Sequence, residues 1–262
     1  MTAEERRQQL SEVLARRGFA DLSALAAELG VSESTVRRDL TQLEEEGVAR
    51  RTHGGAVFVS DRFSALNYSA REMTAVAEKQ AIGRMVASLV EDGETILLDG
   101  GTTTFQVAKN LLSRTLQVVT NSLPIANVLS CAGNIELTFV GGYIYPRTGV
   151  ALGPIVVQTL APLHVNKAII STAGITEEGL FNANMLMVES EQRMMASADE
   201  VIVVADSSKF GHKALARICG WDQVDRVVTD DRLAPEWQER LRGAGAEVIL
   251  APAAEVAVGG GG

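Results

Sequence analysis

Short runs of Val, Ile and Leu recur between residues 95 and 250, and segments with helical spacing of apolar residues separate them. Such a continuous run is typical of a strand that is buried on both faces of a sheet. Strands that alternate with helices favour a mostly parallel sheet with helices on both faces. The pattern therefore predicts an α/β domain. The expected strands are residues 95–99, 116–120, 135–140, 167–171, 201–206, 226–230 and 247–250.

The loop after the first expected strand is rich in glycine and threonine and leads directly into a helical segment. Glycine lets the backbone turn sharply and approach a ligand closely, and the free N–H groups at a helix start attract anions. The loop matches neither a Walker A sequence nor a dinucleotide-binding fingerprint. It predicts a phosphate site, with an ordinary capped helix start as the alternative. The residues of this 99–104 loop are Asp99, Gly100, Gly101, Thr102, Thr103 and Thr104.

Later strands of the expected sheet also end in polar residues or glycines. Ligands of parallel sheets bind at the carboxyl ends of the strands, so we expect these residues to gather at the edge that carries the 99–104 loop. Lys209 follows an apolar strand within a serine-rich turn, a position that suits binding of phosphate or sugar hydroxyls. Glu189 either faces this site or is an acid in the N-terminal turn of a helix. The candidate ligand-binding residues outside the loop are Asn121, Ser122, Gly141, Gly142, Arg147, Glu189 and Lys209.

The beginning of the chain shows three segments with helical spacing of apolar residues, followed by a basic hairpin. The helical segments cover about residues 3–17, 22–29 and 33–46. Gly30 lies in the tight turn between the second and third segments, which is typical of a helix-turn-helix unit. Residues 48–59 predict two short strands around a Gly-Gly turn. Together these elements predict a winged helix-turn-helix.

The third helical segment has an apolar stripe of Val36, Leu40 and Leu43, and its opposite face is polar. Ser32 is expected to cap its start. Hydroxyl and guanidinium groups hydrogen-bond base edges and phosphates in a major groove, so the polar face and the hairpin predict DNA binding. His53 is also explained as a simple turn residue. The candidate DNA-binding residues are Ser34, Thr35, Arg37, Arg38, Arg50, Arg51 and His53.

The charge distribution restricts the kind of DNA binding. A net charge of −9 argues against a protein that coats nucleic acid in general. Residues 1–62 contain nine Arg, no Lys and eleven acidic residues, so their net charge is −2 and the cations occur mainly as Arg-Arg pairs. Clustered cations among acids predict a protein that binds selected sites and has a modest, strongly salt-dependent affinity for other DNA.

Other features of the composition indicate where the protein works. The chain has no run of 18 apolar residues and no apolar signal region, which predicts a cytoplasmic protein without membrane contact. Cys131 and Cys219 are far apart in sequence, and we expect two buried, reduced thiols. The three histidines show no metal-ligand spacing, so we expect no metal and no cofactor.

The character of the sequence changes between residues 57 and 77, which are polar, rich in serine and without a sustained period. A length of 262 residues suits one small and one large domain on either side of this segment. The expected limits are 1–58 for a winged helix-turn-helix DNA-binding domain, 59–77 for a linker, 78–256 for an effector-binding α/β domain and 257–262 for a flexible glycine-rich tail.

In combination, these segments resemble the DeoR family of bacterial transcriptional regulators of sugar metabolism. The resemblance covers nearly the whole chain and rests on V-S-E-S-T-V-R-R-D-L, R-T-H-G-G-A, D-G-G-T-T-T, V-V-T-N-S-L and A-D-S-S-K-F-G. It implies a winged helix-turn-helix joined to a sugar-phosphate sensor domain whose fold resembles ribose-5-phosphate isomerases and coenzyme A transferases. It also implies a homo-oligomer, a dimer or a tetramer, that is often a repressor released by a phosphorylated sugar.

The residues and the resemblance together predict a repressor of a sugar-catabolic operon. Its expected partners are double-stranded operator DNA and a small phosphorylated sugar. One alternative is an isomerase-like enzyme with a DNA-binding head, because Asp99, Glu189 and Lys209 are expected at one edge and acid–base pairs can isomerise a sugar phosphate. Another is a head that binds protein, which the Ser/Thr/Arg face disfavours. The fused head makes sensing the simpler use of the pocket, so we expect no enzyme activity.

Overall fold

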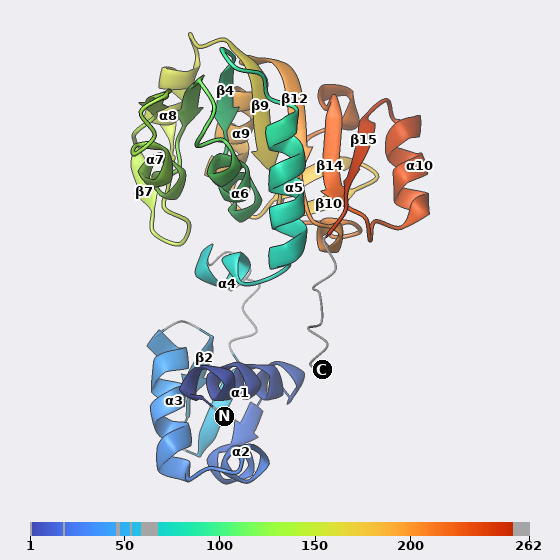
Figure 1. Cartoon of the computed structure of the whole chain (residues 1–262). Coiled ribbons are helices and arrows are strands. Elements are labelled where there is room, and N and C mark those ends of the chain that lie inside the picture. The colour runs from blue at the N-terminus through green and yellow to red at the C-terminus, as the bar shows by residue number, and fades with distance from the viewer. Residues whose placement is uncertain (1, 18, 46–47, 53, 59–67, 254–262) are drawn as a thin grey trace, which may run out of the picture. The chain divides into compact units, whose positions relative to one another are not determined.

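The chain folds into two compact units, residues 1–70 and residues 71–262. Each unit has its own helices and strands (Figure 1) and its own buried apolar residues. Among the residues with a described structure, no helix is long and apolar enough to cross a membrane. The computed structural model describes residues 2–17, 19–45, 48–52, 54–58 and 68–253.

The smaller unit is a winged helix-turn-helix, as the sequence predicts. Its core draws on all three helices, and Leu14, Leu25 and Leu40 are completely buried. The two expected wing strands pair in antiparallel fashion, and a third strand, which the sequence pattern did not indicate, pairs with one of them. The elements are α1 (Ala3–Arg17), β1 (Phe19–Asp21), α2 (Leu22–Leu29), α3 (Glu33–Glu45), β2 (Ala49–Arg51) and β3 (Gly55–Phe58).

Two glycines fix the turns of this unit. Gly30 ends α2 with a φ of 65°, a left-handed conformation that favours glycine, and its N–H donates to the carbonyl of Ala27. Gly55 starts β3 so close to β1 that a Cβ atom would lie 2.2 Å from the carbonyl oxygen of Ala20. The wing therefore needs glycine at Gly55 for space rather than for backbone freedom.

The larger unit contains a parallel sheet of seven strands in the order β15-β14-β12-β9-β4-β5-β6. Every neighbouring pair in it is parallel, and all seven strands expected from the sequence are present, with ends shifted by at most three residues. The strands are β4 (Thr95–Leu98), β5 (Leu116–Thr120), β6 (Ile135–Phe139), β9 (Val165–Ser171), β12 (Ala198–Val204), β14 (Arg226–Asp230) and β15 (Glu247–Ala251).

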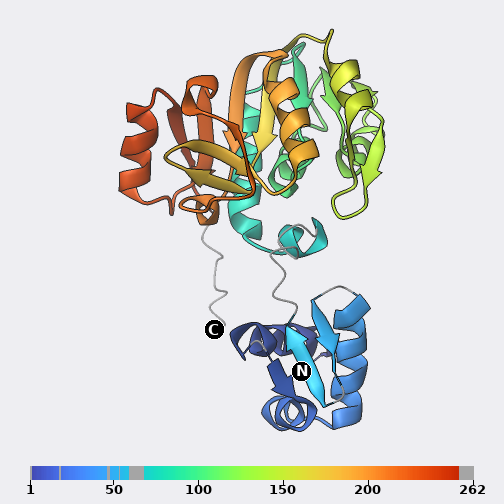
Figure 2. The same cartoon turned by 180° about the vertical axis from the view of Figure 1, so that it is seen from behind.

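Helices cover both faces of this sheet, which explains why its inner strands carry runs of buried apolar residues. Ile96 packs in the cluster on one face and Leu97 in the cluster on the other, because successive side chains of a strand alternate. Figure 1 shows α5 and α6 in front of the sheet, and the reverse view in Figure 2 shows α9 on the opposite face. The helices are α5 (Val76–Ser88), α6 (Thr102–Asn110), α7 (Leu123–Leu129), α8 (Pro154–Leu160), α9 (Met185–Met195) and α10 (Pro235–Gly243).

Smaller elements, not expected from the sequence, complete this unit. An antiparallel pair and a three-stranded sheet of order β10-β11-β13 flank the main sheet. These elements are β7 (Tyr143–Tyr145), β8 (Val150–Leu152), β10 (Gly174–Thr176), β11 (Gly179–Asn182), β13 (Ala216–Cys219) and the single 3-10 turns η2 (Ser207–Lys209) and η3 (Trp221–Gln223).

The segment expected to be a linker, 59–77, contains helical structure. Helix α4 (Tyr68–Glu72) lies within it, and α5 begins at Val76. Residues 59–67 lie outside the described part of the chain. The first turn of α5 shows no apolar pattern in the sequence, because its buried residues include the charged Glu78 and Lys79. The expected tail, 257–262, also lies outside the described residues.

The expectation of two buried thiols is wrong for one cysteine. Cys219 is buried in β13, and burial raises the pKa of its thiol to about 12. Cys131 is exposed, because it lies in the turn that follows α7 and not on the apolar side of an element. Neither forms a disulfide.

Candidate DNA-binding surface and ligand site

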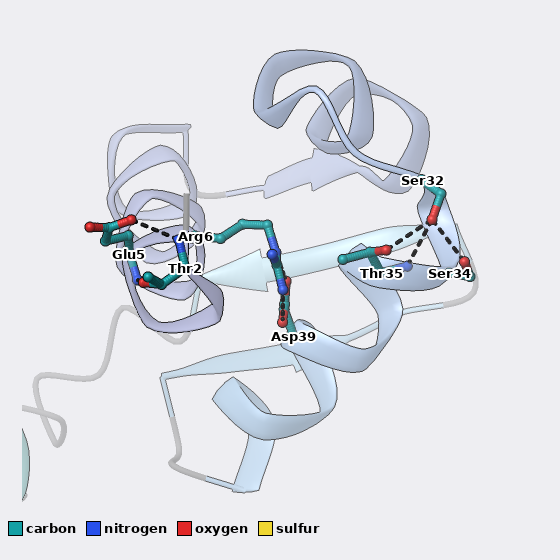
Figure 3. Close-up of polar contacts among 7 residues, drawn as sticks. All are labelled: Thr2, Glu5, Arg6, Ser32, Ser34, Thr35 and Asp39. Carbon is teal, nitrogen blue, oxygen red and sulfur yellow. Dashed lines mark hydrogen bonds and ion pairs between the residues drawn. The ribbon is translucent and has the colours of Figure 1, made fainter.

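Three hydroxyl groups gather at the start of α3. The Ser32 Oγ accepts a hydrogen bond of 3.3 Å from the N–H of Thr35, which confirms the expected cap. The same oxygen lies 2.8 Å from the Ser34 Oγ and 2.9 Å from the Thr35 Oγ1 (Figure 3). Ser34 is exposed and Thr35 is half-buried, so the start of the helix presents hydroxyls to solvent.

The arginines of α3 point away from its apolar stripe. Arg37 and Arg38 are exposed, whereas Val36 before them and Leu40 after them are completely buried. The Nη2 of Arg37 lies 3.4 Å from the Glu33 Oε2, with 64% and 48% of the two side chains exposed. An exposed ion pair of this kind contributes little free energy, so it does not withhold Arg37 from a phosphate.

The wing arginine is turned toward the end of α3. The Arg51 Nε lies 2.6 Å from the Glu44 Oε2, and its Nη1 donates to the Thr41 Oγ1 at 2.9 Å. Arg51 also lines a groove with Arg37 and with residues of the wing turn, so the helix and the wing share one surface. The backbone of Arg50 belongs to β2. His53 lies outside the described residues.

A partly buried ion pair attaches α3 to α1. The Arg6 guanidinium donates to both oxygens of Asp39, at 2.5 Å from Nε to Oδ2 and 3.1 Å from Nη2 to Oδ1 (Figure 3). Asp39 is buried on the inner side of α3. This two-point contact fixes the rotation of α3, which determines where Arg38 points. Arg6 thus positions the DNA-binding face, a role that its place in an Arg-Arg pair did not reveal.

In the larger unit, the 99–104 loop joins the carboxyl end of β4 to the start of α6, as expected. The N–H of Gly101 donates to the Thr104 Oγ1 at 2.8 Å, and that hydroxyl lies 2.6 Å from the carbonyl oxygen of Asp99. The hydroxyl of Thr104 therefore holds the loop together and is not offered to a ligand. Thr102 and Thr103 are buried in the first turn of α6.

The carboxyl of Asp99 faces β9. Its Oδ2 accepts hydrogen bonds from the N–H of Ser171 at 3.0 Å and from the Ser171 Oγ at 2.5 Å. Burial raises the pKa of Asp99 in spite of these bonds. Gly101 lies against the same serine, since a Cβ atom there would be 2.2 Å from the Ser171 Oγ. Asp99 and Ser171 thus lock β4, β9 and the loop into one arrangement.

The acidic residue of α9 that is buried beside Asp99 is Glu191, and Glu189 is exposed. The Nδ2 of Asn182 donates to the Glu191 Oε1. Burial first, and then the charge of Asp99, raise the pKa of Glu191 well above its ordinary value. The sequence analysis selected Glu189 and missed Glu191, although the helical period places Glu191 on the buried side of α9. Glu191 lies three residues after the buried Val188, whereas Glu189 lies one residue after it and faces away.

The buried carboxyl of Glu191 gives a prediction about pH. An acid with a raised pKa binds its proton more tightly in the folded protein, so folding stability falls as pH rises from the unfolded pKa toward the folded one. In the Glu191→Gln variant the side chain at this position does not titrate. The free energy of unfolding of the variant should therefore increase relative to that of the wild type as the pH rises above 4.5, the ordinary pKa of glutamate. Urea unfolding of both proteins, from about pH 4 to about pH 8, measures this difference. A difference that stays constant with pH contradicts the prediction.

Asn121 and Ser122, which follow β5, have different surroundings. Asn121 is 1% exposed, and its Nδ2 donates to the carbonyl oxygen of Ala151 at 2.9 Å. Its Oδ1 is buried without a hydrogen-bond partner among the described residues. Ser122 caps α7, because its Oγ accepts a hydrogen bond of 3.5 Å from the N–H of Ile125. The structure therefore gives Ser122 a structural role and leaves Asn121 with an unused acceptor.

Replacement of Ser122 by alanine tests these roles. The variant loses the cap of α7, and we expect its free energy of unfolding to fall by about 1 kcal/mol. We expect no change in ligand affinity, because the hydroxyl points into the helix start. Urea unfolding and ligand titration of the same samples measure the two effects. A large loss of ligand affinity at unchanged stability would instead assign Ser122 to the site.

Lys209 lies in η2 at the carboxyl end of β12 and is half-buried. Asp206 caps this turn, since its Oδ1 accepts a hydrogen bond of 3.2 Å from the N–H of Ser208. A second cation, Lys79 of α5, is buried nearby. Burial lowers the pKa of Lys79, the charge of Asp206 raises it and the charge of Lys209 lowers it. The sequence offered no sign of Lys79, because a single lysine in a helix is usually a surface residue.

The remaining candidates lie farther out on the same unit. Gly141 and Gly142 follow β6, and a Cβ atom at Gly141 would meet no other atom within 4 Å. Arg147 is exposed in the turn between β7 and β8. The structure thus brings the 99–104 loop and Asn121 to the ends of adjacent strands, while Arg147 and Glu189 are exposed. Among the described residues no group of three His, Cys, Asp or Glu side chains could hold a metal ion.

Comparison with known proteins identifies the family. Residues 6–62 match the family model for a DeoR-like helix-turn-helix domain, and residues 74–231 match the model for a DeoR C-terminal sensor domain. The chain belongs to the DeoR family. This DeoR-family protein is therefore a DNA-binding transcriptional regulator, and its division into head and sensor follows the two matched segments.

Individual relatives agree with this assignment. The uncharacterized HTH-type transcriptional regulator YulB of Bacillus subtilis (strain 168) is 35% identical over 253 residues, which cover 96% of this chain and 98% of that protein. The HTH-type transcriptional repressor GlcR of the same strain is 34% identical over 230 residues, or 88% of this chain and 89% of that protein. Both are named as regulators and not as enzymes, which favours the regulator over the isomerase-like alternative.

Among solved structures, ribose 5-phosphate isomerase A from Neisseria gonorrhoeae is similar to half of the chain. The alignment covers 50% of this chain and 52% of that one, with 12% identity and a TM-score of 0.37. A similarity of this degree carries no information about activity.

Proposed function

We propose that this DeoR-family protein represses a sugar-catabolic operon and leaves its operator when a phosphorylated sugar binds the sensor unit. The observation that carries the proposal is the 99–104 loop. It places two buried glycines and the amides that begin α6 at the carboxyl edge of the parallel sheet. Free N–H groups and the positive end of the helix dipole favour a phosphate there.

The rest of the sheet edge supports a sugar phosphate rather than a bare anion. Lys209 adds a cation, and Asn121 and Glu191 add oxygen atoms that suit sugar hydroxyls. The effector is the only small molecule that the proposal requires, so no metal or cofactor takes part. The proposed place of action is the cytoplasm, where operator DNA and sugar phosphates occur together.

On the DNA side, Ser34, Thr35, Arg37 and Arg38 would enter a major groove while the wing lies along the backbone. A homo-oligomer, a dimer or a tetramer, would place two heads on half-sites separated by roughly 34–36 Å or a multiple of it. Effector binding would favour a state in which the two heads cannot dock on both half-sites at once. A coupling free energy of about 1–3 kcal/mol gives about 5- to 150-fold release, which is enough for regulation.

One contact links the candidate ligand site to the residues at which the larger unit begins. The Nζ of Lys79, which lies near Asp206 and Lys209, donates to the carbonyl oxygen of Arg71 at 2.6 Å and to that of Thr74. Arg71 is the first residue of the larger unit. A charged ligand that displaces Lys79 would therefore also displace Arg71 and Thr74, at the start of the larger unit.

A gel shift with the DNA upstream of the protein's own gene, titrated with free and phosphorylated sugars, tests the proposal. We expect a specific complex that one phosphorylated sugar dissociates and its unphosphorylated form does not. Specific binding that no sugar phosphate changes would overturn the effector assignment and leave the head assignment standing. Dissociation by the free sugar would overturn the role of the 99–104 loop as a phosphate site.

A further inference from the structure

Several buried side-chain oxygen atoms have no hydrogen-bond partner among the described residues, and two of them belong to residues of the candidate ligand site. These two atoms are the Oε2 of Glu191 and the Oδ1 of Asn121, and the two residues are 3% and 1% exposed. A buried polar atom left unsatisfied costs about 1–3 kcal/mol. Most buried polar atoms in folded proteins are paired, so such atoms at the edge of a proposed binding site indicate groups that a ligand satisfies.

The partners of Glu191 fix its place relative to the 99–104 loop. Its Oε1 is held by the Nδ2 of Asn182, at the end of β11, which orients the other oxygen. Asp99 lies within electrostatic range of Glu191 and is itself bound to Ser171 at the end of β9. Glu191 therefore lies within electrostatic range of the strand end from which the 99–104 loop departs.

The chemistry of these atoms differs from that of the loop. A phosphate needs hydrogen-bond donors, and the amides that begin α6 supply them. The Oδ1 of Asn121 only accepts hydrogen bonds, so it suits a hydroxyl group and not a phosphate, and the carboxyl of Glu191 also suits a hydroxyl group. Burial and the neighbouring Asp99 raise the pKa of Glu191, which favours the uncharged form of its carboxyl beside an anion site. An acid can thus lie beside an anion site without opposing it.

We propose that Glu191 is a specificity-determining residue of the sensor, which binds a hydroxyl group of the sugar part of the effector. The proposal rests on the proposed function and deepens it, because it names the ligand class as a polyhydroxylated phosphate ester and not any phosphate. Asn121 supplies an unpaired acceptor that suits another hydroxyl group of the ligand. Glu189, two positions earlier on α9 and exposed, takes no part.

Calorimetric titration of the full-length protein tests the proposal. The probes are inorganic phosphate, ribose 5-phosphate, fructose 1-phosphate and glucose 6-phosphate, and the proteins are the wild type, Glu191→Met, Glu191→Gln and the matched control Glu189→Met. We expect Glu191→Met to weaken binding of the best sugar phosphate by about 10- to 100-fold, as loss of a buried hydrogen bond implies. Binding of inorganic phosphate should not change. Glu191→Gln should restore most of the loss, and Glu189→Met should bind as the wild type does.

Other outcomes separate failure of this inference from failure of the proposed function. Unchanged binding of every sugar phosphate by a folded Glu191→Met overturns the role of Glu191. If that variant does not melt cooperatively, monodeoxy analogues of the best sugar phosphate are titrated against the wild type, where at least one should bind about tenfold more weakly. Equal binding of all analogues overturns the proposal. A wild type that binds no sugar phosphate more tightly than inorganic phosphate overturns the proposed effector site itself.

Discussion

Arg38→Ala is expected to abolish operator recognition while the protein stays folded. Arg38 is exposed on α3, beside the hydroxyls at the start of that helix. One arginine that contacts a base or phosphates contributes about 1–3 kcal/mol, and two heads on one operator double the loss. Affinity should therefore fall by about 30-fold to about 10⁴-fold. The dependence of binding on salt should also become shallower, because fewer counterions are released.

Fluorescence anisotropy with labelled operator DNA at several salt concentrations measures this effect. Arg84→Ala is the matched control, because Arg84 is exposed on α5 of the sensor unit and outside the DNA-binding face. The thermal melting temperature of each variant shows that the fold is intact. If the Arg38→Ala variant binds DNA with the affinity and selectivity of the wild type, Arg38 does not contact DNA. The orientation proposed for α3 is then wrong as well.

Gly101→Ala is expected to produce a repressor that binds its operator but no longer responds to the effector. The backbone of Gly101 has a φ of −95°, which alanine adopts without strain, so the effect is one of space. The new Cβ atom would lie 2.2 Å from the Ser171 Oγ, and that hydroxyl holds Asp99. Displacing these groups costs about 1–3 kcal/mol, which corresponds to about 5- to 150-fold weaker effector binding.

Effector-induced release in the gel shift measures the loss, and calorimetric titration measures the affinity. Gly133→Ala is the matched control, because a Cβ atom at Gly133 meets no other atom within 4 Å. The heads have their own core, so operator affinity of both variants should equal that of the wild type. Full release of Gly101→Ala at the wild-type effector concentration would show that the 99–104 loop tolerates displacement and does not hold the phosphate.

The sequence alone was sufficient for the winged helix-turn-helix and for the seven strands of the parallel sheet. Both follow from local patterns: the helical spacing of Val36, Leu40 and Leu43, and the runs of Val, Ile and Leu that any strand covered on both faces requires. Glycine and serine at element ends added the Gly30 turn and the Ser32 cap. These features depend on residues that are close in sequence, which is why a pattern can reveal them.

Contacts between segments that are far apart along the chain could not be predicted from the sequence. Arg6 and Asp39 are 33 residues apart, and nothing in either segment indicates that they pair. Strand β1 is too short to have a period, and it exists because β3 offers an unpaired edge. The first turn of α5 buries the charged residues Glu78 and Lys79, so no apolar pattern marked its start and the expected linker extended over it.

The ligand site shows the same division. The 99–104 loop and Asn121 lie at strand ends that the sequence located, because the carboxyl ends of parallel strands always share one edge. The sequence could not distinguish Ser122 as a cap from Ser122 as a ligand, or Glu191 from Glu189, since each choice depends on which neighbours fill the surrounding space. Local periodicity thus determined the elements and the edge that we propose as the ligand site. Tertiary packing alone decided which side chains at that edge have a hydrogen-bond partner within the protein and which do not.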